Sequence, residues 1–146
     1  MAVEVEIRGK KFPLCLTVAA LDALNEKCGG IGGVFDFLRG DPVEEAGLSD
    51  AQIEQEKIAA QSRALYNNAW LLGLLITEGE ENRLMEAHFD GGNTARRRVP
   101  GPEDLVHLMT PGQISSYRLE ILQAVNASMR RTLEATPKNG FQGAEE

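Results

Sequence analysis

Apolar and polar residues alternate over the first sixteen positions, in two runs separated by a glycine. The apolar members of these runs are Val3, Val5, Ile7, Phe12, Leu14 and Leu16. Alternation with period two is typical of strands that bury one face. Gly9 suits a turn, and Pro13 favours an edge position because it lacks an N–H. The pattern predicts a β-hairpin over residues 3–16.

The spacing of apolar residues changes from strand-like to helical after Thr17. It predicts a helix that Thr17 caps and that Gly29 and Gly30 end. Because a two-stranded hairpin is marginal alone, we expect its apolar face to pack on this helix. A further helical turn or two is predicted over residues 34–38.

A long helix is predicted from Ser49, which forms a capping-box pattern with Gln52, to about Thr77. We expect the acidic residues and glycine of residues 78–81 to end it. Its roughly 27 residues would span about 40 Å at 1.5 Å per residue, more than the width of a small core. The first half is mostly polar and the second carries a continuous apolar stripe, so the second half is the predicted core element.

The remaining chain predicts a loop, a short helix and a long helix. Residues 89–102 are rich in glycine and include Arg96, Arg97 and Arg98, so we expect this to be the least ordered internal segment. Pro102 begins the short helix. Thr110 and Gln113 form a second capping box, and the helix that follows is expected to continue to about residue 135.

The predicted fold is α+β and predominantly α-helical. An N-terminal β-hairpin packs on a small bundle of helices, including one long central helix and a long C-terminal helix. A single domain spans residues 1–136, with the hairpin at 3–16 and the helical bundle at 17–136. Residues 137–146 are expected to form a flexible C-terminal tail.

Composition places the 146-residue chain in the ordinary globular range, with 42% hydrophobic residues and a formal net charge of −7. The negative charge makes nucleic acid an unlikely partner. Charge is unevenly spread, because residues 41–56 carry six carboxylates and no basic residue, whereas residues 96–98 are all arginine. Such a complementary pair suggests head-to-tail contact between like subunits as a hypothesis.

No combination of residues predicts catalysis, a cofactor or a metal site. His88 and His107 have no metal-ligand spacing with the cysteines, and the glycines of residues 29–33 follow a helix instead of opening one. We therefore expect a protein that is not an enzyme. The N-terminus has no secretory pattern, and the longest apolar run, residues 69–76, is too short for a membrane span.

The segment from Val5 to Thr17, VEIRGKKFPLCLT, with the leucine spacing and Glu26–Gly29 that follow, resembles tail assembly chaperones of long-tailed, siphovirus-type phages and prophages. Those proteins begin with a hairpin reading roughly apolar-x-G-K-x-aromatic-x-L-x-L-T and continue as helices. Residues 71–79 are also similar to their core helix and its exit.

The resemblance implies a chaperone that binds the tape measure protein and keeps it soluble during tail assembly. Its expected partners are the tape measure protein, copies of itself and the major tail tube protein, with no membrane. The expected location is the cytoplasm of the bacterial host, and the protein is expected to be absent from the mature virion. Two alternatives stay open: a structural or connector component of the virion, and a small regulatory protein that binds nucleic acid through the Arg96–Arg98 loop.

The C-terminal helix is the predicted partner surface because its apolar positions reach more than one face. The arginine loop is the second candidate, as a contact for an acidic protein surface. The candidate partner-binding residues are Leu119, Leu122, Val125, Met129, Leu133, Arg96, Arg97 and Arg98.

Overall fold

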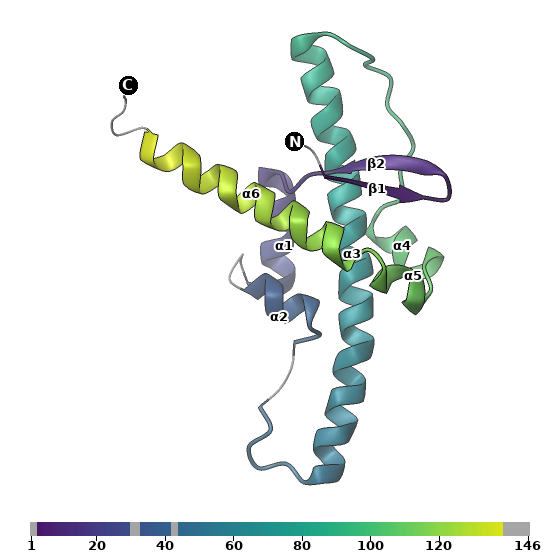
Figure 1. The fold of residues 1–146 in the computed structure, drawn as a ribbon, viewed down its shortest axis with the longest axis vertical. Helices are drawn as coiled ribbons and strands as arrows, with labels where there is room; N and C mark the ends of the chain where they lie inside the picture. Colours follow the sequence, from purple (N-terminus) through teal and green to yellow (C-terminus); the bar gives the residue numbers. More distant parts are fainter. Residues whose placement is uncertain (1–2, 30–32, 42–43, 139–146) are drawn as a thin grey trace.

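One long helix forms the axis of the molecule, and the other elements surround its middle (Figure 1). The computed structural model describes residues 3–29, 33–41 and 44–138, with side chains through residue 128. The elements in chain order are β1 (Val3–Ile7), β2 (Lys10–Leu14), α1 (Val18–Cys28), α2 (Val34–Leu38), α3 (Asp50–Asp90), α4 (Pro102–Leu108), α5 (Pro111–Ser115) and α6 (Arg118–Lys138).

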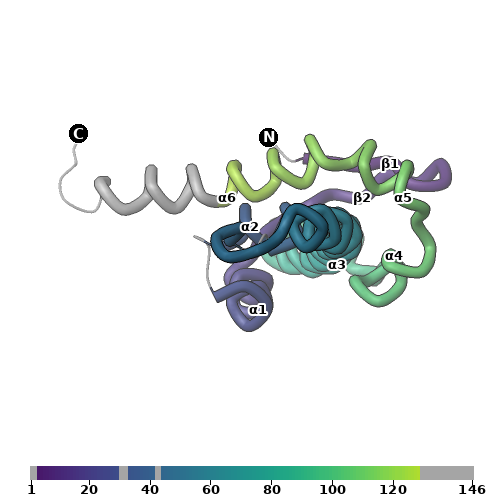
Figure 2. Tube along the Cα trace, turned by 90° about the horizontal axis from the view of Figure 1, so that it is seen from below, coloured from purple at the N-terminus to yellow at the C-terminus, as the bar shows by residue number. Residues whose placement is uncertain are grey.

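Seen along α3, the hairpin and α6 lie on one side, α1 and α2 on a second, and α4 on a third (Figure 2). Side chains from all of these elements join one apolar cluster around the buried middle turns of α3. The α+β, mainly helical fold with an N-terminal hairpin, a long central helix and a long C-terminal helix is therefore confirmed.

The hairpin is antiparallel, with Val5 opposite Phe12 and Ile7 opposite Lys10. Arg8 and Gly9 both have positive φ, 54° and 81°, which is the backbone of a two-residue type I′ turn. The hairpin packs mainly on α3, and α6 contacts β1, so the predicted packing on α1 is wrong. The end of β2 is held to α3 because the Cys15 N–H donates to the Leu75 carbonyl at 3.2 Å.

The predicted limits of α1 are confirmed at both ends. The Thr17 side chain accepts from the Ala20 N–H at 3.0 Å, and Gly29 takes a left-handed conformation after the last turn.

The carbonyls at the end of α2 are bound by amide side chains of α3. Asn67 Nδ2 donates to Phe37 O at 2.8 Å, and the buried Asn68 donates to Leu38 O at 2.9 Å. These bonds dock α2 on α3 because buried carbonyls need partners.

Helix α3 begins as predicted but ends at Asp90 instead of near Thr77. The capping box is present, with Gln52 N–H donating to Ser49 Oγ and Ser49 N–H donating to Gln52 Oε1. Gly79, predicted to help end the helix, lies inside it, where a Cβ would overlap the carbonyl oxygen of Pro13. The glycine is therefore explained by the close approach of β2 and not by a helix end.

The C-terminal region forms two helices where one was predicted. Helix α5 ends at Ser115, and α6 starts at Arg118 after a turn in which Ser116 Oγ donates to Gln113 O at 2.6 Å. Tyr117, at this turn, donates its hydroxyl to Glu6 O of β1 at 2.6 Å. Helix α6 extends to Lys138, two residues into the predicted tail, and residues 139–146 lie outside the described part of the chain.

Candidate partner-binding surface

Two adjoining hollows, of about 680 and 180 Å³, lie where the junction of β2 and α1, the second half of α3 and the middle of α6 meet. Cys15, Asn82 and Ser128 line both of them. We call the pair the α1–α3–α6 groove. Its other lining residues are Val3, Pro13, Leu14, Leu16, Thr17, Val18, Ala19, Glu78, Gly79, Glu81, Arg83, Met85, Glu86, Ala124 and Ala127.

Large apolar side chains of α1 and α3 are exposed beside this groove. Val18 is 88% exposed and Met85 is 57% exposed, and both line the larger hollow. Phe89 is 85% exposed and lies four residues after Met85, which places the two side chains on the same face of α3. We call Val18, Met85 and Phe89 the apolar rim. Exposed apolar residues that gather beside a hollow mark a surface that binds a partner, unlike single exposed residues scattered elsewhere.

The start of α1 is joined to the interior of α3 by a polar contact at the groove. Thr17 Oγ1, at the start of α1, donates to Glu78 Oε1 of α3 at 2.6 Å. The same Thr17 hydroxyl caps α1, so one side chain fixes both the start of α1 and its place against α3. Val18 is thereby held in position at the edge of the groove, because it is the first residue of the capped helix.

The buried carboxylate of Glu80 in α3 binds the segment that returns along the molecule after the end of this helix. Glu80 accepts from Arg83 Nε and Nη2 at 2.9 and 2.8 Å and from the Arg97 backbone N–H at 2.6 Å. Arg83 also donates to the carbonyls of Asn93 and Ala95. The hydrogen bond from Arg83 lowers the pKa of Glu80 against the opposing effect of burial, with help from the Arg97 N–H.

The arginine loop is therefore fastened to the body and is not the loosely held segment that the sequence predicts. Arg96 forms an ion pair with Glu81, and the Arg97 guanidinium donates to Lys11 O at 2.8 Å and lies 5.1 Å from the Phe12 ring centroid. Arg98 is exposed and lines a separate hollow beside the hairpin turn. Of the three arginines, Arg98 is thus the one that a partner could bind without breaking an ion pair, hydrogen bond or ring contact described above.

The predicted residues of α6 divide into different environments. Leu119 is 64% exposed, whereas Leu122 is partly buried against the core. Val125 is 0% exposed and belongs to the chain's own core, so it is not available to a partner in this conformation. Met129 and Leu133 lie in α6, in the part whose side chains are outside the described residues.

Sequence reasoning missed the apolar rim because it ended the central helix too early. Met85 and Phe89 are four residues apart, which is helical spacing, but the glycine and glutamates at 78–81 suggested a helix end before them. The helical spacing after Thr17 does not separate Val18 from the other apolar residues of α1, although Val18 is the first helical residue and is exposed.

Within the described residues, no three His, Cys, Asp or Glu side chains lie close enough together to hold a metal ion. No helix in this part of the chain is long and apolar enough to cross a membrane. Comparisons with models of protein families, with curated proteins and with solved structures found no match.

Proposed function

We propose that this protein is a phage or prophage tail assembly chaperone that binds the tape measure protein and keeps it soluble during tail assembly. The proposal starts from the resemblance carried by residues 5–29 and 71–79. It is supported by a surface suited to an apolar client, since Val18 and Met85 of the apolar rim line the larger hollow of the α1–α3–α6 groove.

The observation that carries the proposal is the exposure of Val18, Met85 and Phe89 beside the α1–α3–α6 groove. A long helical client presents apolar side chains at positions i, i+3, i+4 and i+7, and such a helix binds by laying this face into an apolar groove. Side chains as large as these, left in water on a small protein, favour a binding role over a purely internal one. The client is thus proposed to dock along α3, beside α1.

The nucleic-acid alternative has less support than the sequence alone gave it. Arg96 and Arg97 already contact Glu81, Lys11 O and the ring of Phe12, which leaves Arg98 as the arginine of the three without such a contact. Arg98 lines a hollow with two other cations, Arg8 and Lys10, and one carboxylate, Asp104, and so small a net positive charge gives little of the phosphate attraction on which nucleic-acid binding depends. The virion-component alternative is not distinguished by these contacts and is an outcome of the experiment.

The test is co-expression of this chain with the tape measure protein encoded in the same phage genome. We expect the tape measure protein to become soluble and to co-purify with this chain. The triple variant V18S/M85S/F89S should fold normally and lose at least about tenfold of the co-purified client, because each substitution removes exposed apolar area from the contact.

Matched controls separate the groove from other exposed apolar sites. I58S removes a side chain that is 60% exposed on the opposite end of α3, and we expect it to retain the client. L119S tests the surface predicted on α6. If L119S loses the client and the rim variant does not, the binding surface is on α6. If wild type neither rescues nor binds the tape measure protein, the chaperone proposal is wrong, and detection of the chain in purified virions would support the structural alternative.

A further inference from the structure

Another hollow, of about 360 Å³, lies beside the hairpin turn. It shares no lining residue with the α1–α3–α6 groove. Three cationic side chains line it: Arg8, Lys10 and Arg98. Its apolar wall includes Phe12, Val99 and Leu108, and Leu108 is half exposed. We call it the hairpin-tip hollow. It combines positive charge with apolar surface in a protein whose net charge is −7.

The cations of this hollow have no ion-pair partner in the described chain. The ion pairs that the described residues form are Arg39–Asp36, Arg83–Glu80 and Arg96–Glu81, and none uses Arg8, Lys10 or Arg98. The one carboxylate in the lining, Asp104, accepts from the Gly101 N–H at 2.8 Å. The hollow therefore retains positive charge that no ion pair among the described residues neutralises.

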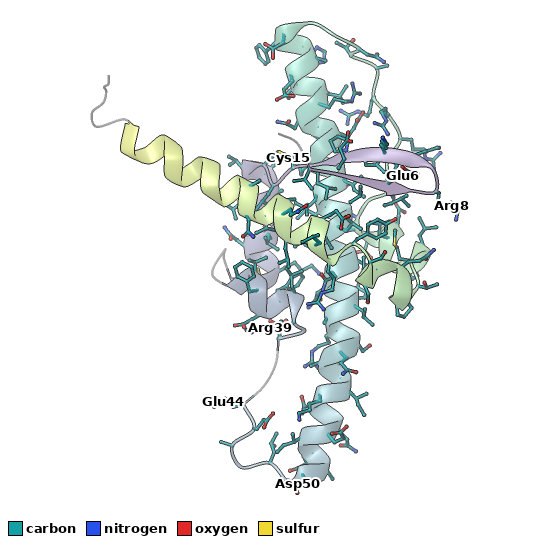
Figure 3. The ribbon with its side chains drawn as sticks, viewed as in Figure 1. Glu6, Arg8, Cys15, Arg39, Glu44 and Asp50 are labelled. Atoms are coloured by element: carbon teal, nitrogen blue, oxygen red, sulfur yellow. The ribbon has the colours of Figure 1, made fainter. Side chains whose placement is uncertain are left out.

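The opposite charge lies at the far end of α3. Four exposed carboxylates are located on the loop before α3 and on its first turns: Glu44, Glu45, Asp50 and Glu54. The partly buried Leu48 and Ile53 lie among them. We call this the acidic end. Figure 3 shows Glu44 and Asp50 at the extremity of the molecule, well apart from Arg8 at the hairpin turn, so the two surfaces do not meet within one chain.

We propose that the acidic end of one copy docks in the hairpin-tip hollow of a second copy. Each surface carries apolar side chains within a field of one sign, and the signs are opposite, so the contact gains both apolar burial and electrostatic attraction. The contact joins two different surfaces and is therefore heterologous, which leads to rings or open chains of subunits and not to a closed two-fold dimer. This proposal does not depend on the chaperone function.

Charge reversal on each side separately, followed by mixing, tests the proposal. K10E/R98E makes the hollow acidic, and E44K/E45K/E54K makes the acidic end basic, since only Asp50 of its four carboxylates is then left. Each variant alone has like charges on both surfaces, so we expect its association constant, measured by sedimentation velocity at low salt, to fall at least about tenfold. In an equimolar mixture, every contact between one variant and the other again pairs opposite charges. We expect association of the mixture to return to within about threefold of wild type.

The control D22K/E26K/D90K makes the same change in net charge as E44K/E45K/E54K, at exposed residues of α1 and of the last turn of α3, and should associate as wild type does. Raising the salt to about 0.5 M should weaken wild-type association, because screening shortens the range of the charges. The rim variant V18S/M85S/F89S should leave association unchanged, which separates this proposal from the client-binding one. A wild-type protein that stays monomeric at low salt, or a mixture that fails to regain association, would overturn the proposal.

Discussion

The two ends of α3 extend beyond the core in opposite directions, but they are held in different ways. At the C-terminal end, Glu80 and Arg83 bind the backbone of the returning segment at Asn93, Ala95 and Arg97. At the N-terminal end, Arg63 donates to the Gly40 carbonyl at 2.8 Å, and the capping box at Ser49 closes the start of the helix. The first turns of α3, before about residue 59, therefore extend into solvent with few contacts to the rest of the described chain.

The difference shows that a helix can continue far past its apolar stripe when polar side chains supply the contacts. Residues 81–90 are mostly exposed or half buried, like residues 50–62, yet the segment that follows them is bound at Asn93, Ala95 and Arg97 by the side chains of Arg83 and Glu80. We expect this asymmetry to appear in stability, because the polar ties at one end are part of the folded core and the cap at the other end acts locally.

The largest effect is expected from Gly79→Ala. Alanine normally stabilises a helix interior relative to glycine by about 1 kcal/mol, but here its Cβ would overlap Pro13 O and push β2 away from α3. We expect the free energy of unfolding, measured with urea, to fall by about 3 kcal/mol. Gly112→Ala is the control, since a Cβ there meets nothing within 4 Å. Equal effects of the two substitutions would contradict the close approach.

The second effect is expected from Glu80→Gln, which weakens the buried ties of the C-terminal end. Replacing the carboxylate removes charge-assisted hydrogen bonds to Arg83 and to the Arg97 N–H, so we expect a loss of about 2 kcal/mol. Glu81→Gln is the matched control, because the pair of Glu81 with Arg96 is exposed, and we expect no measurable change. Hydrogen exchange of the Arg97 amide should accelerate in E80Q alone.

The acid dependence of stability sharpens the same contrast. The folded-state pKa of Glu80 lies below its ordinary value of 4.5, so its contribution is fully present above pH 4.5 and is lost as the pH falls through the lower, folded-state pKa. We therefore expect the unfolding free energies of wild type and E80Q to converge as the solution is acidified. A constant difference down to the acid limit would show that Glu80 is not the group that titrates.

The smallest effect is expected at the acidic end, from Ser49→Ala. This substitution removes the side-chain half of the capping box and is expected to reduce helix stability by about 1 kcal/mol. We expect amide exchange to accelerate over the first turns of α3 only, with little change at residues 81–90. Global destabilisation instead would mean that the two ends are coupled.

Most of the fold follows from local signals in the sequence, and the failures have a common cause. Caps and period predict the hairpin and the starts of α1, α3, α4 and α5, because these features depend on neighbouring residues. Gly79 looks like a helix end unless the position of β2 is known, and Glu80 looks like a solvated carboxylate unless the path of residues 91–101 is known. Packing between distant segments decides such positions.

The candidate surface was harder to predict for the same reason. Val125 and Leu119 have similar hydrophobicity and lie in the same helix, yet one is fully buried and the other is mostly exposed. The arginine cluster was visible as sequence, but which of its members contact the body, Arg96 and Arg97, depends on Glu81 and Lys11. Spacing identifies which residues share a helix face, but not what covers that face.

The glycines of α3 also restrict where the chain can change its length. Gly73 faces the backbone of Gly101 and Pro102, and Gly79 faces Pro13, so two sides of the helix touch other backbone segments at fixed points. One inserted residue between these points would rotate one contact by about 100° relative to the other and bring a side chain against a backbone segment. Insertions should be tolerated in the first turns of α3 or between Gly91 and Gly92, and rejected between 73 and 79.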